Sequence, residues 1–334
     1  MDKFKARLTA QGQHQVANRD YWYSWAPTAK SETIRIILFL ANQMDMELKQ
    51  TDVSSAFLYA DLDPDLHLYL KTPPGMKHRE GKALRILKGI YGLKQAGHLW
   101  YKLLSKVLVT NCGMTMSKLD RCAFYNLETK AVCAIHVDDN LIAAPKSTWQ
   151  QITKALGEEF KIVVDDAKWF LSLEIRRDRI AHHLGVVCPE YILKQRKRFP
   201  QLKNAFASQG FLPYRPSLRH WQKQPTNDDE ADQVDVTLFQ SMVGTCAWAA
   251  TQWRPDIAYC TFRAARFSAD PRMQHLKGAK TILAYLLSTP DHGLTFHKSE
   301  SKRYPDDVFQ VRTYVDSDFG GSATESKGRS TGGA

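Results

Sequence analysis

The chain has 334 residues, of which 43% are hydrophobic and 11% aromatic, so it can bury the cores of two or three subdomains. Its 46 Lys and Arg residues against 35 Asp and Glu residues give a formal net charge of +11, which favours a polyanionic partner. No apolar run approaches the roughly 18 residues that span a bilayer, and the first residues lack the apolar stretch of a signal peptide. We therefore expect an intracellular protein, in the cytoplasm or nucleus, with no membrane partner and with reduced cysteines.

The spacing of cysteine and histidine excludes a zinc site. None of the six cysteines belongs to a Cys-x-x-Cys pair. His182 and His183 are adjacent, but no Cys or His stands at zinc-finger spacing from them. Any metal chemistry must therefore be sought among oxygen ligands.

The first residues along the chain that could carry chemistry are Lys5 and Arg7. Their spacing of two places both cations on one face if the segment is a strand. Two such cations could hold a triphosphate, because positive groups neutralise charge on transferring phosphates. A lone Lys-x-Arg pair is more often a solvated strand face, and both interpretations stay open at this point.

A helical pattern over 33–44 is followed by a short predicted strand that ends at Asp52. The adjacent Ser54 and Ser55 are suited to capping a turn of helix after that strand. Asp52 is therefore expected at a strand end.

Two adjacent aspartates, Asp138 and Asp139, interrupt the otherwise apolar run 132–144. The apolar flanks indicate two strands, and the polar break indicates a tight hairpin with Asp138, Asp139 and Asn140 at its tip. Asp and Asn are ordinary turn residues, so taken alone this tip needs no function. Asp52 makes a metal site the better interpretation of this tip. One carboxylate at a strand end and two on a hairpin of the same sheet could together hold the two metal ions that phosphoryl transfer uses. Hard oxygen ligands indicate Mg²⁺, or else Mn²⁺.

Eight runs, in this order, resemble the reverse transcriptase of copia-type LTR retrotransposons. They are KARL at 5–8, WAPTAK at 25–30, TIR at 33–35, QTDVSSAFL at 50–58, YGLKQA at 91–96, VDD at 137–139, FLSLEI at 170–175 and RPDIA at 254–258. The likeness covers nearly the whole chain. It departs from the family pattern at His136, where the family usually has Tyr, and at Ser172, where it has Gly.

The resemblance implies a role for each matching residue. Asp52, Asp138 and Asp139 become the catalytic metal ligands, and Lys5 and Arg7 contact the triphosphate. Phe57, five residues after the first aspartate, becomes a steric gate that favours deoxynucleotides, since the 2′-hydroxyl distinguishes the two sugars. Gln95 is expected near the base and the template. Without the resemblance, Phe57 could be a core aromatic and the run that contains Gln95 merely the start of a helix.

The stretch 191–199 resembles a basic helix of the polymerase thumb, with Lys194, Arg196, Lys197 and Arg198 as nucleic-acid ligands. Neutralising several phosphates gives affinity that does not depend on sequence, as an enzyme that copies any template requires. A charge run of this kind is otherwise a solubilising helix face.

The implied fold class is α+β: a polymerase palm, made of an antiparallel sheet with packed helices. We predict partial fingers and palm over 1–176 and a mainly helical thumb and connection over 177–297, with helices at 97–109, 236–253 and 271–288 and a polar loop at 222–230. Residues 298–334 resemble the truncated start of a ribonuclease H-like domain, with Asp316 at the position of its first metal ligand. Further carboxylates of that site are missing, so we expect no ribonuclease H activity.

Two functional hypotheses follow, and both begin from the same ancestry. The first is an RNA-directed DNA polymerase domain that uses an RNA template, a DNA primer and deoxynucleoside triphosphates, with other Pol or Gag products as further partners. The second is a catalytically impaired retrotransposon remnant that retains only nucleic-acid binding, because fingers and nuclease are truncated. A different palm-type nucleotidyltransferase is a third interpretation that nothing outside the three aspartates supports.

Overall fold

The computed structural model describes residues 8–73, 75–76, 81–202 and 234–298, and the backbone at 317–318 and 331–332. The predictions for Lys5, Arg7, Asp316 and the loop 222–230 lie outside these residues. The chain divides into two compact units, Met1–Phe170 with Arg179–His182, and Leu171–Asp178 with His183–Ala334. Each unit is described by itself.

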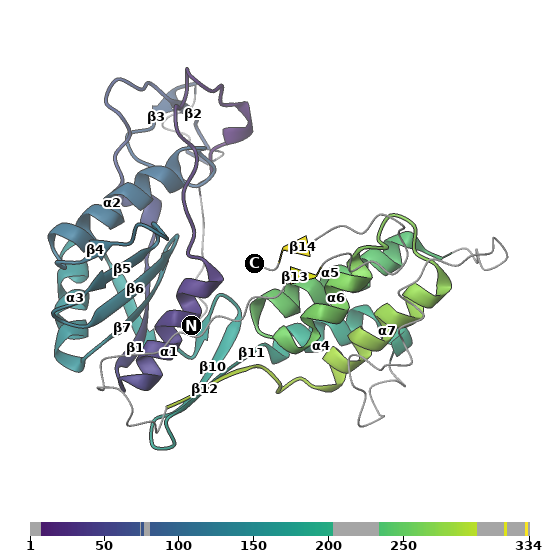
Figure 1. The fold of residues 1–334 in the computed structure, drawn as a ribbon. Helices are drawn as coiled ribbons and strands as arrows, with labels where there is room; N and C mark the ends of the chain where they lie inside the picture. The colour runs from purple at the N-terminus through teal and green to yellow at the C-terminus, as the bar shows by residue number, and fades with distance from the viewer. Residues whose placement is uncertain are drawn as a thin grey trace. The chain divides into compact units, whose positions relative to one another are not determined.

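The first unit is built on a six-stranded antiparallel sheet with strand order β4-β5-β6-β7-β1-β8 (Figure 1). Its strands are β1 (Glu47–Val53), β4 (Thr115–Met116), β5 (Ala123–Asn126), β6 (Ala131–His136), β7 (Asp139–Ala144) and β8 (Ile162–Asp166). Three helices pack on it: α1 (Ser31–Gln43), α2 (Ala96–Thr110) and α3 (Lys146–Glu159). The α+β prediction is confirmed.

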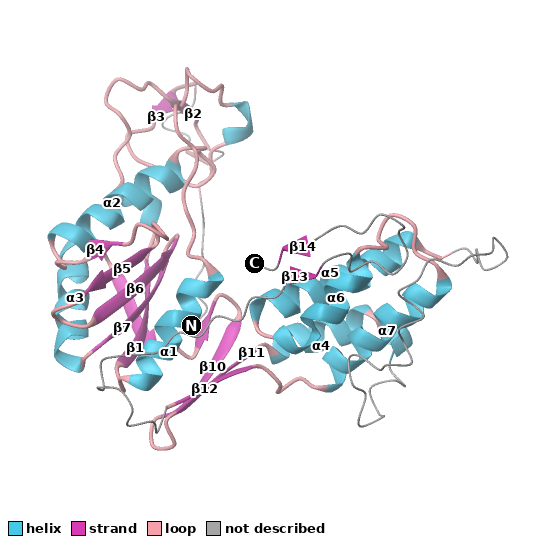
Figure 2. Ribbon diagram, viewed as in Figure 1, coloured by secondary structure: helices cyan, strands magenta, loops and turns pink. Residues whose placement is uncertain are grey.

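Helices cover both faces of this sheet (Figure 2). The main core lies on the face of α2 and α3, where Trp100, Leu104 and Leu156 pack against Ile142 and Val53. Side chains alternate along a strand, so the residues directly before and after Ile142 and Val53 in their strands point to the other face of the sheet. Helix α1 covers that face. The centre of the sheet is thus buried on both sides.

A smaller part of this unit pairs β2 (Tyr69–Lys71) with β3 (Ala83–Arg85) and adds short 3-10 helices at Gly12–His14 and Ala56–Tyr59. The N-terminal segment is joined to the loop before α2, since Ala10 N donates to Tyr91 O at 2.7 Å. A β-carbon at Gly12 would lie 1.9 Å from Gly92 O, so this close approach of two backbones requires glycine. Trp169–Phe170 forms the short strand β9 at the end of the unit.

The second unit combines an antiparallel strand set with a helical bundle. Strand β11 (His183–Val187) pairs with both β10 (Leu173–Asp178) and β12 (Leu294–His297). The helices are α4 (Pro189–Arg198), α5 (Val236–Gln252), α6 (Ala258–Ala265) and α7 (Met273–Ser288), preceded at α6 by a 3-10 turn (Pro255–Ile257). The predicted helices are confirmed, whereas the pattern gave no sign of β11 or β12. At the end of the chain β13 (Ser317–Asp318) pairs with β14 (Thr331–Gly332).

Candidate active site

Two of the three predicted carboxylates stand on neighbouring strands at the same level. Strands β1 and β7 are antiparallel, and Asp52 is the direct partner of Asp139. Directly opposed residues of an antiparallel pair point to the same face, with β-carbons about 4.5–5.5 Å apart. The sheet therefore brings together two carboxylates that are far apart in sequence.

The third carboxylate belongs to the hairpin between β6 and β7. Asp138 O accepts a hydrogen bond of 3.2 Å from Val53 N, so the hairpin loop adjoins the residue after Asp52. The predicted tip is wrong by one residue, because the two loop residues are Val137 and Asp138, while Asp139 and Asn140 already belong to β7. Turn propensity alone favoured Asp and Asn for the loop, but pairing of Asp139 with both neighbouring strands holds it in the sheet.

The hairpin loop has a strained backbone that another element holds in place. Val137 has φ 60°, a conformation that is a true outlier for a β-branched residue. The indole nitrogen of Trp100, a buried residue of α2, donates to Val137 O at 2.6 Å. Strain of this kind persists only where surrounding structure determines it, and it gathers at functional sites. Sequence reasoning missed Trp100, although a buried indole N–H does need an acceptor.

The carboxylates repel one another. Burial is the largest cause that raises the pKa of Asp139, and the charges of Asp138 and Asp52 raise it further. A hydrogen bond of 3.4 Å donated by Gln50 Nε2 and the proximity of His136 lower the pKa of Asp139, but they do not offset the increase. Asp138 and Asp139 are partly buried and Asp52 is exposed, and a bound cation would stabilise such a group of neighbouring anions.

The backbone brings the three carboxylates together, but the side chains do not form a ready-made ligand set. Across the ranges that the structure describes, no three Asp, Glu, His or Cys side chains are arranged to hold one metal ion. Sharing an ion therefore requires a movement of at least one of Asp52, Asp138 and Asp139.

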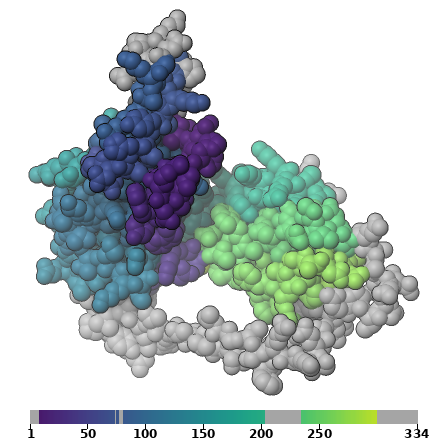
Figure 3. All heavy atoms as spheres, turned by 90° about the horizontal axis from the view of Figure 1, so that it is seen from above, coloured from purple at the N-terminus to yellow at the C-terminus, as the bar shows by residue number. Residues whose placement is uncertain are grey.

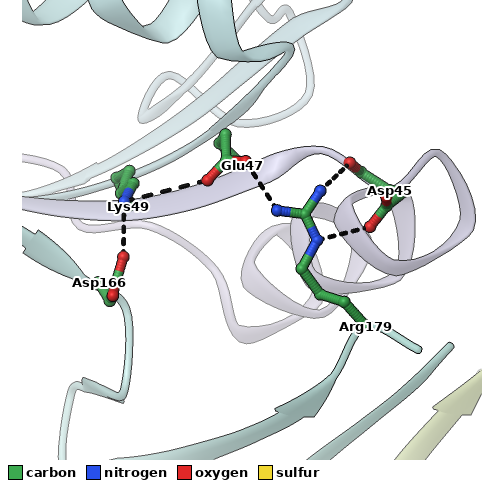
Figure 4. A network of polar contacts seen from close by, with 5 residues as sticks. All are labelled: Asp45, Glu47, Lys49, Asp166 and Arg179. Atoms are coloured by element: carbon green, nitrogen blue, oxygen red, sulfur yellow. Dashed lines mark hydrogen bonds and ion pairs between the residues drawn. The ribbon is translucent and has the colours of Figure 1, made fainter. Parts of the chain in front are cut away.

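The other end of β1 is anchored by a chain of ion pairs (Figure 4). Arg179 donates to Asp45 Oδ1 and to Glu47 Oε1, both at 2.7 Å, and Lys49 Nζ contacts Asp166 Oδ1 at 2.6 Å. The Lys49 ammonium lowers the pKa of Asp166 through its hydrogen bond and its charge. Because Asp166 belongs to β8, these contacts hold the strand that carries Asp52 in register with its neighbour.

The resemblance assigned a role to Phe57, and the structure shows its surroundings. Phe57 is half-buried in the 3-10 helix after β1, and its ring meets the Tyr91 ring edge-on at a centroid distance of 4.8 Å. That helix is not capped as predicted: Ser55 is left-handed (φ 59°) and makes no side-chain capping bond.

Gln95 is buried and its amide is occupied. Gln95 Nε2 donates to Asp20 O at 3.1 Å, and its Oε1 accepts from Gln15 Nε2 at 3.0 Å. These two hydrogen bonds join the N-terminal segment to the start of α2. In this structure the Gln95 side chain therefore holds Gln15 and the backbone at Asp20 in place.

The family is shown by comparison with known proteins. A family model described as "Reverse transcriptase (RNA-dependent DNA polymerase)" matches residues 1–206. This chain belongs to the reverse transcriptase family. The resemblance seen in the sequence is thereby confirmed.

Relatives of this reverse transcriptase chain are Pol polyproteins of transposons. The chain is 31% identical over 327 residues to the Retrovirus-related Pol polyprotein from transposon RE1 of Arabidopsis thaliana, covering 96% of this chain and 21% of that protein. For transposon TNT 1-94 of Nicotiana tabacum the identity is 29%, covering 97% and 24%. The Ty1-BL Gag-Pol polyprotein of Saccharomyces cerevisiae is 27% identical, covering 89% and 17%. The chain thus spans about a fifth of the length of these relatives. The relatives fit the hypothesis of a reverse transcriptase domain and not the hypothesis of a retrotransposon remnant.

Among solved structures, a foamy viral protease-reverse transcriptase in complex with double-stranded DNA overlaps with 79% of this chain and 39% of its own. The TM-score is 0.40 and the identity 13%.

The basic residues predicted for the reverse transcriptase thumb lie on α4. Arg196 Nε and one terminal nitrogen donate to Leu287 O at 3.0 and 2.6 Å, so this guanidinium caps the C-terminal end of α7. Arg198 donates to Ser241 Oγ at 2.6 Å and stays exposed. Lys194 and Lys197 are exposed, which leaves three of the four cations at the surface.

Within the described residues, no helix is long and apolar enough to cross a membrane.

Proposed function

We propose that this chain is an RNA-directed DNA polymerase domain, which extends the 3′-hydroxyl of a DNA primer with deoxynucleoside triphosphates on an RNA template. The observation that carries the proposal is the register of β1 and β7, which sets Asp52 opposite Asp139 beside the loop of Asp138 in a chain of the reverse transcriptase family.

The three carboxylates would hold two Mg²⁺ or Mn²⁺ ions. Their chemistry fits, because Asp52, Asp138 and Asp139 supply only hard oxygen donors and their mutual repulsion favours a cation. When bound, such ions activate the attacking oxygen and stabilise the leaving one.

The remaining residues of the site have supporting tasks in this proposal. Trp100 and Val53 hold the loop that carries Asp138 through their hydrogen bonds. Phe57, supported by Tyr91, excludes the 2′-hydroxyl of a ribonucleotide. Lys5 and Arg7 contact the triphosphate, and Lys194, Lys197 and Arg198 contact phosphates of the template and primer. Other Pol or Gag products are further partners in this proposal.

A primer-extension assay on poly(rA)/oligo(dT) tests the proposal. The full chain with Mg²⁺ should extend the primer, and Asp138→Asn should lower the rate about 100-fold or more, because metal ions contribute several kcal/mol of charge stabilisation. Asp65→Asn, which removes an exposed carboxylate elsewhere in the first unit, is the matched control and should keep the parent rate. Extension that survives in Asp138→Asn, or no extension by the parent while hybrid binding persists, would contradict the proposal.

The sugar selectivity is tested separately. Phe57→Ala should raise incorporation of ribonucleotides relative to deoxynucleotides, because it opens the space next to the sugar. Phe57→Tyr, which keeps the ring, should preserve the parent selectivity. An unchanged ratio in Phe57→Ala would remove the gate from the proposal and leave the metal site standing.

A further inference from the structure

Three aromatic side chains of the first unit are exposed on one short stretch of chain before α1. Trp22, Tyr23 and Trp25 have 56%, 68% and 63% of their surface exposed. Clustered exposed apolar groups mark interaction surfaces, whereas single ones are normal. None of these rings has a task in the proposed active site. We call this set the aromatic track.

The aromatic track is held against the start of α2. The Tyr23 ring stacks on the His98 ring at a centroid distance of 5.6 Å and an angle of 28°. His98 Nδ1 donates to Trp25 O at 2.8 Å, so the imidazole contacts two residues of the track. A β-carbon at Gly97 would lie 3.3 Å from Ala26 Cβ, which shows how closely the two segments approach. In Figure 3 the N-terminal segment, in purple, lies at the surface against the blue part of the chain.

Positive charge lines the same part of the surface. Lys94, Lys102 and Lys106 are exposed. His98, Lys102 and Lys106 recur every four residues on α2, the spacing that places side chains along one face of a helix, and Lys94 lies two residues before the helix begins. Lys102 Nζ lies 5.9 Å from the centre of the Tyr23 ring, within cation–π range. Helix α2 contains no Asp or Glu, so no acidic side chain of the helix interrupts the row.

We propose that the aromatic track and this lysine row bind single-stranded RNA, with bases stacked on the rings and phosphates beside the lysines. Proteins that bind single strands without sequence preference combine these two features. The faces of bases are available for stacking only where the strand is unpaired, so the surface suits a single strand and not a duplex. Identification of this strand as the unpaired template rests on the proposed function, while the binding itself does not.

The test is a fluorescence-anisotropy titration of a labelled single-stranded 20-mer of U with the full chain, without nucleotides. Trp22→Leu combined with Trp25→Leu keeps apolar bulk but removes two stacking faces, and it should weaken binding about 25-fold, from about 5-fold for each ring. Trp22→Phe with Trp25→Phe, which keeps the faces, should stay close to the parent. A blunt RNA:DNA hybrid should bind to all three proteins with similar affinity.

Charge is tested by salt dependence. Lys102→Gln should lower the slope of log affinity against log salt by about 0.7 for the single strand. Lys154→Gln, an equal charge change on the exposed side of α3, should leave the slope unchanged. Running the titrations in an Asp138→Asn background separates this inference from polymerase activity, because binding there needs no catalysis.

Three outcomes would overturn the inference. In the first, the leucine variant binds the single strand as well as the parent does. In the second, it loses hybrid and single strand in equal measure. In the third, sedimentation shows that the parent is a dimer and the leucine variant a monomer, since the rings would then form an interface between copies of the chain.

Discussion

Replacing Asp120 tests how α1 is held at its first turn and, through α1, how the catalytic sheet is covered. Lys30, the residue before α1, supplies no side-chain cap. Asp120, a residue that is 7% exposed, supplies an acceptor for this helix end from another part of the chain. It accepts hydrogen bonds from Lys30 N at 3.0 Å, Thr33 Oγ1 at 2.5 Å and Cys122 N at 2.9 Å.

The expected cost of Asp120→Ala follows from these three bonds. Hydrogen bonds to a charged group contribute about 1.5–3 kcal/mol each, and a buried donor left unpaired costs a further 1–3 kcal/mol, although such values do not add fully. We expect a loss of about 3 kcal/mol in the free energy of unfolding. Asp120→Asn retains one acceptor and should lose about half as much. For a unit of this size 3 kcal/mol corresponds to a fall of about 6–12 °C in Tm.

The pH dependence has a definite sign. Burial raises the pKa of Asp120, but the hydrogen bonds from Thr33, Lys30 and Cys122 outweigh it and bring the pKa below its ordinary value of 3.8. The stabilisation is therefore complete above the ordinary pKa and is lost as the pH falls through the lowered value. The difference between the parent chain and Asp120→Ala should be full at pH 7 and shrink below about pH 3.8.

Urea unfolding followed by tryptophan fluorescence at pH 7 and at pH 3 measures both effects. Glu128→Ala, at an exposed position, is the control and should change the unfolding free energy by less than about 0.5 kcal/mol. A loss below about 1 kcal/mol for Asp120→Ala at pH 7, or an equal loss at both pH values, would refute the reasoning.

Three further predictions concern other parts of the chain. Mg²⁺ at ten times its dissociation constant should stabilise the parent chain by about 1.4 kcal/mol in a thermal-shift assay but leave Asp139→Asn unmoved, and a shift in both would place the metal elsewhere. Ser172 has φ 70°, a left-handed conformation that glycine adopts more readily than serine. Ser172→Gly should therefore raise the free energy of unfolding by about 0.5 kcal/mol and with it the midpoint of urea unfolding, and a lower midpoint would contradict this. Burial raises the pKa of Cys112 to about 11 and that of Cys122 to about 12, so Ellman's reagent at pH 8 should label these thiols slowly until the chain is denatured, and fast labelling of the folded chain would show that they are accessible.

The sequence alone was sufficient for the elements whose signal is local. Apolar residues at helical spacing predicted the helices seen as α1, α2, α5 and α7 within about two residues of their ends. Apolar runs around the vicinal aspartates predicted the hairpin, and the motif order predicted the family. Each of these signals is contained in a short stretch of neighbouring residues.

Tertiary structure decided what depends on residues far apart in the chain. The hairpin loop begins at Val137 in a conformation that its own preference opposes, because Trp100 binds its carbonyl. Gln95 and Arg196 both donate to backbone carbonyls of distant segments, partners that their own neighbours in the sequence do not indicate. A sequence states which groups can donate or accept a hydrogen bond, but the partner of a buried polar group is determined only when packing brings the two together, because burial removes the water that would otherwise take its place.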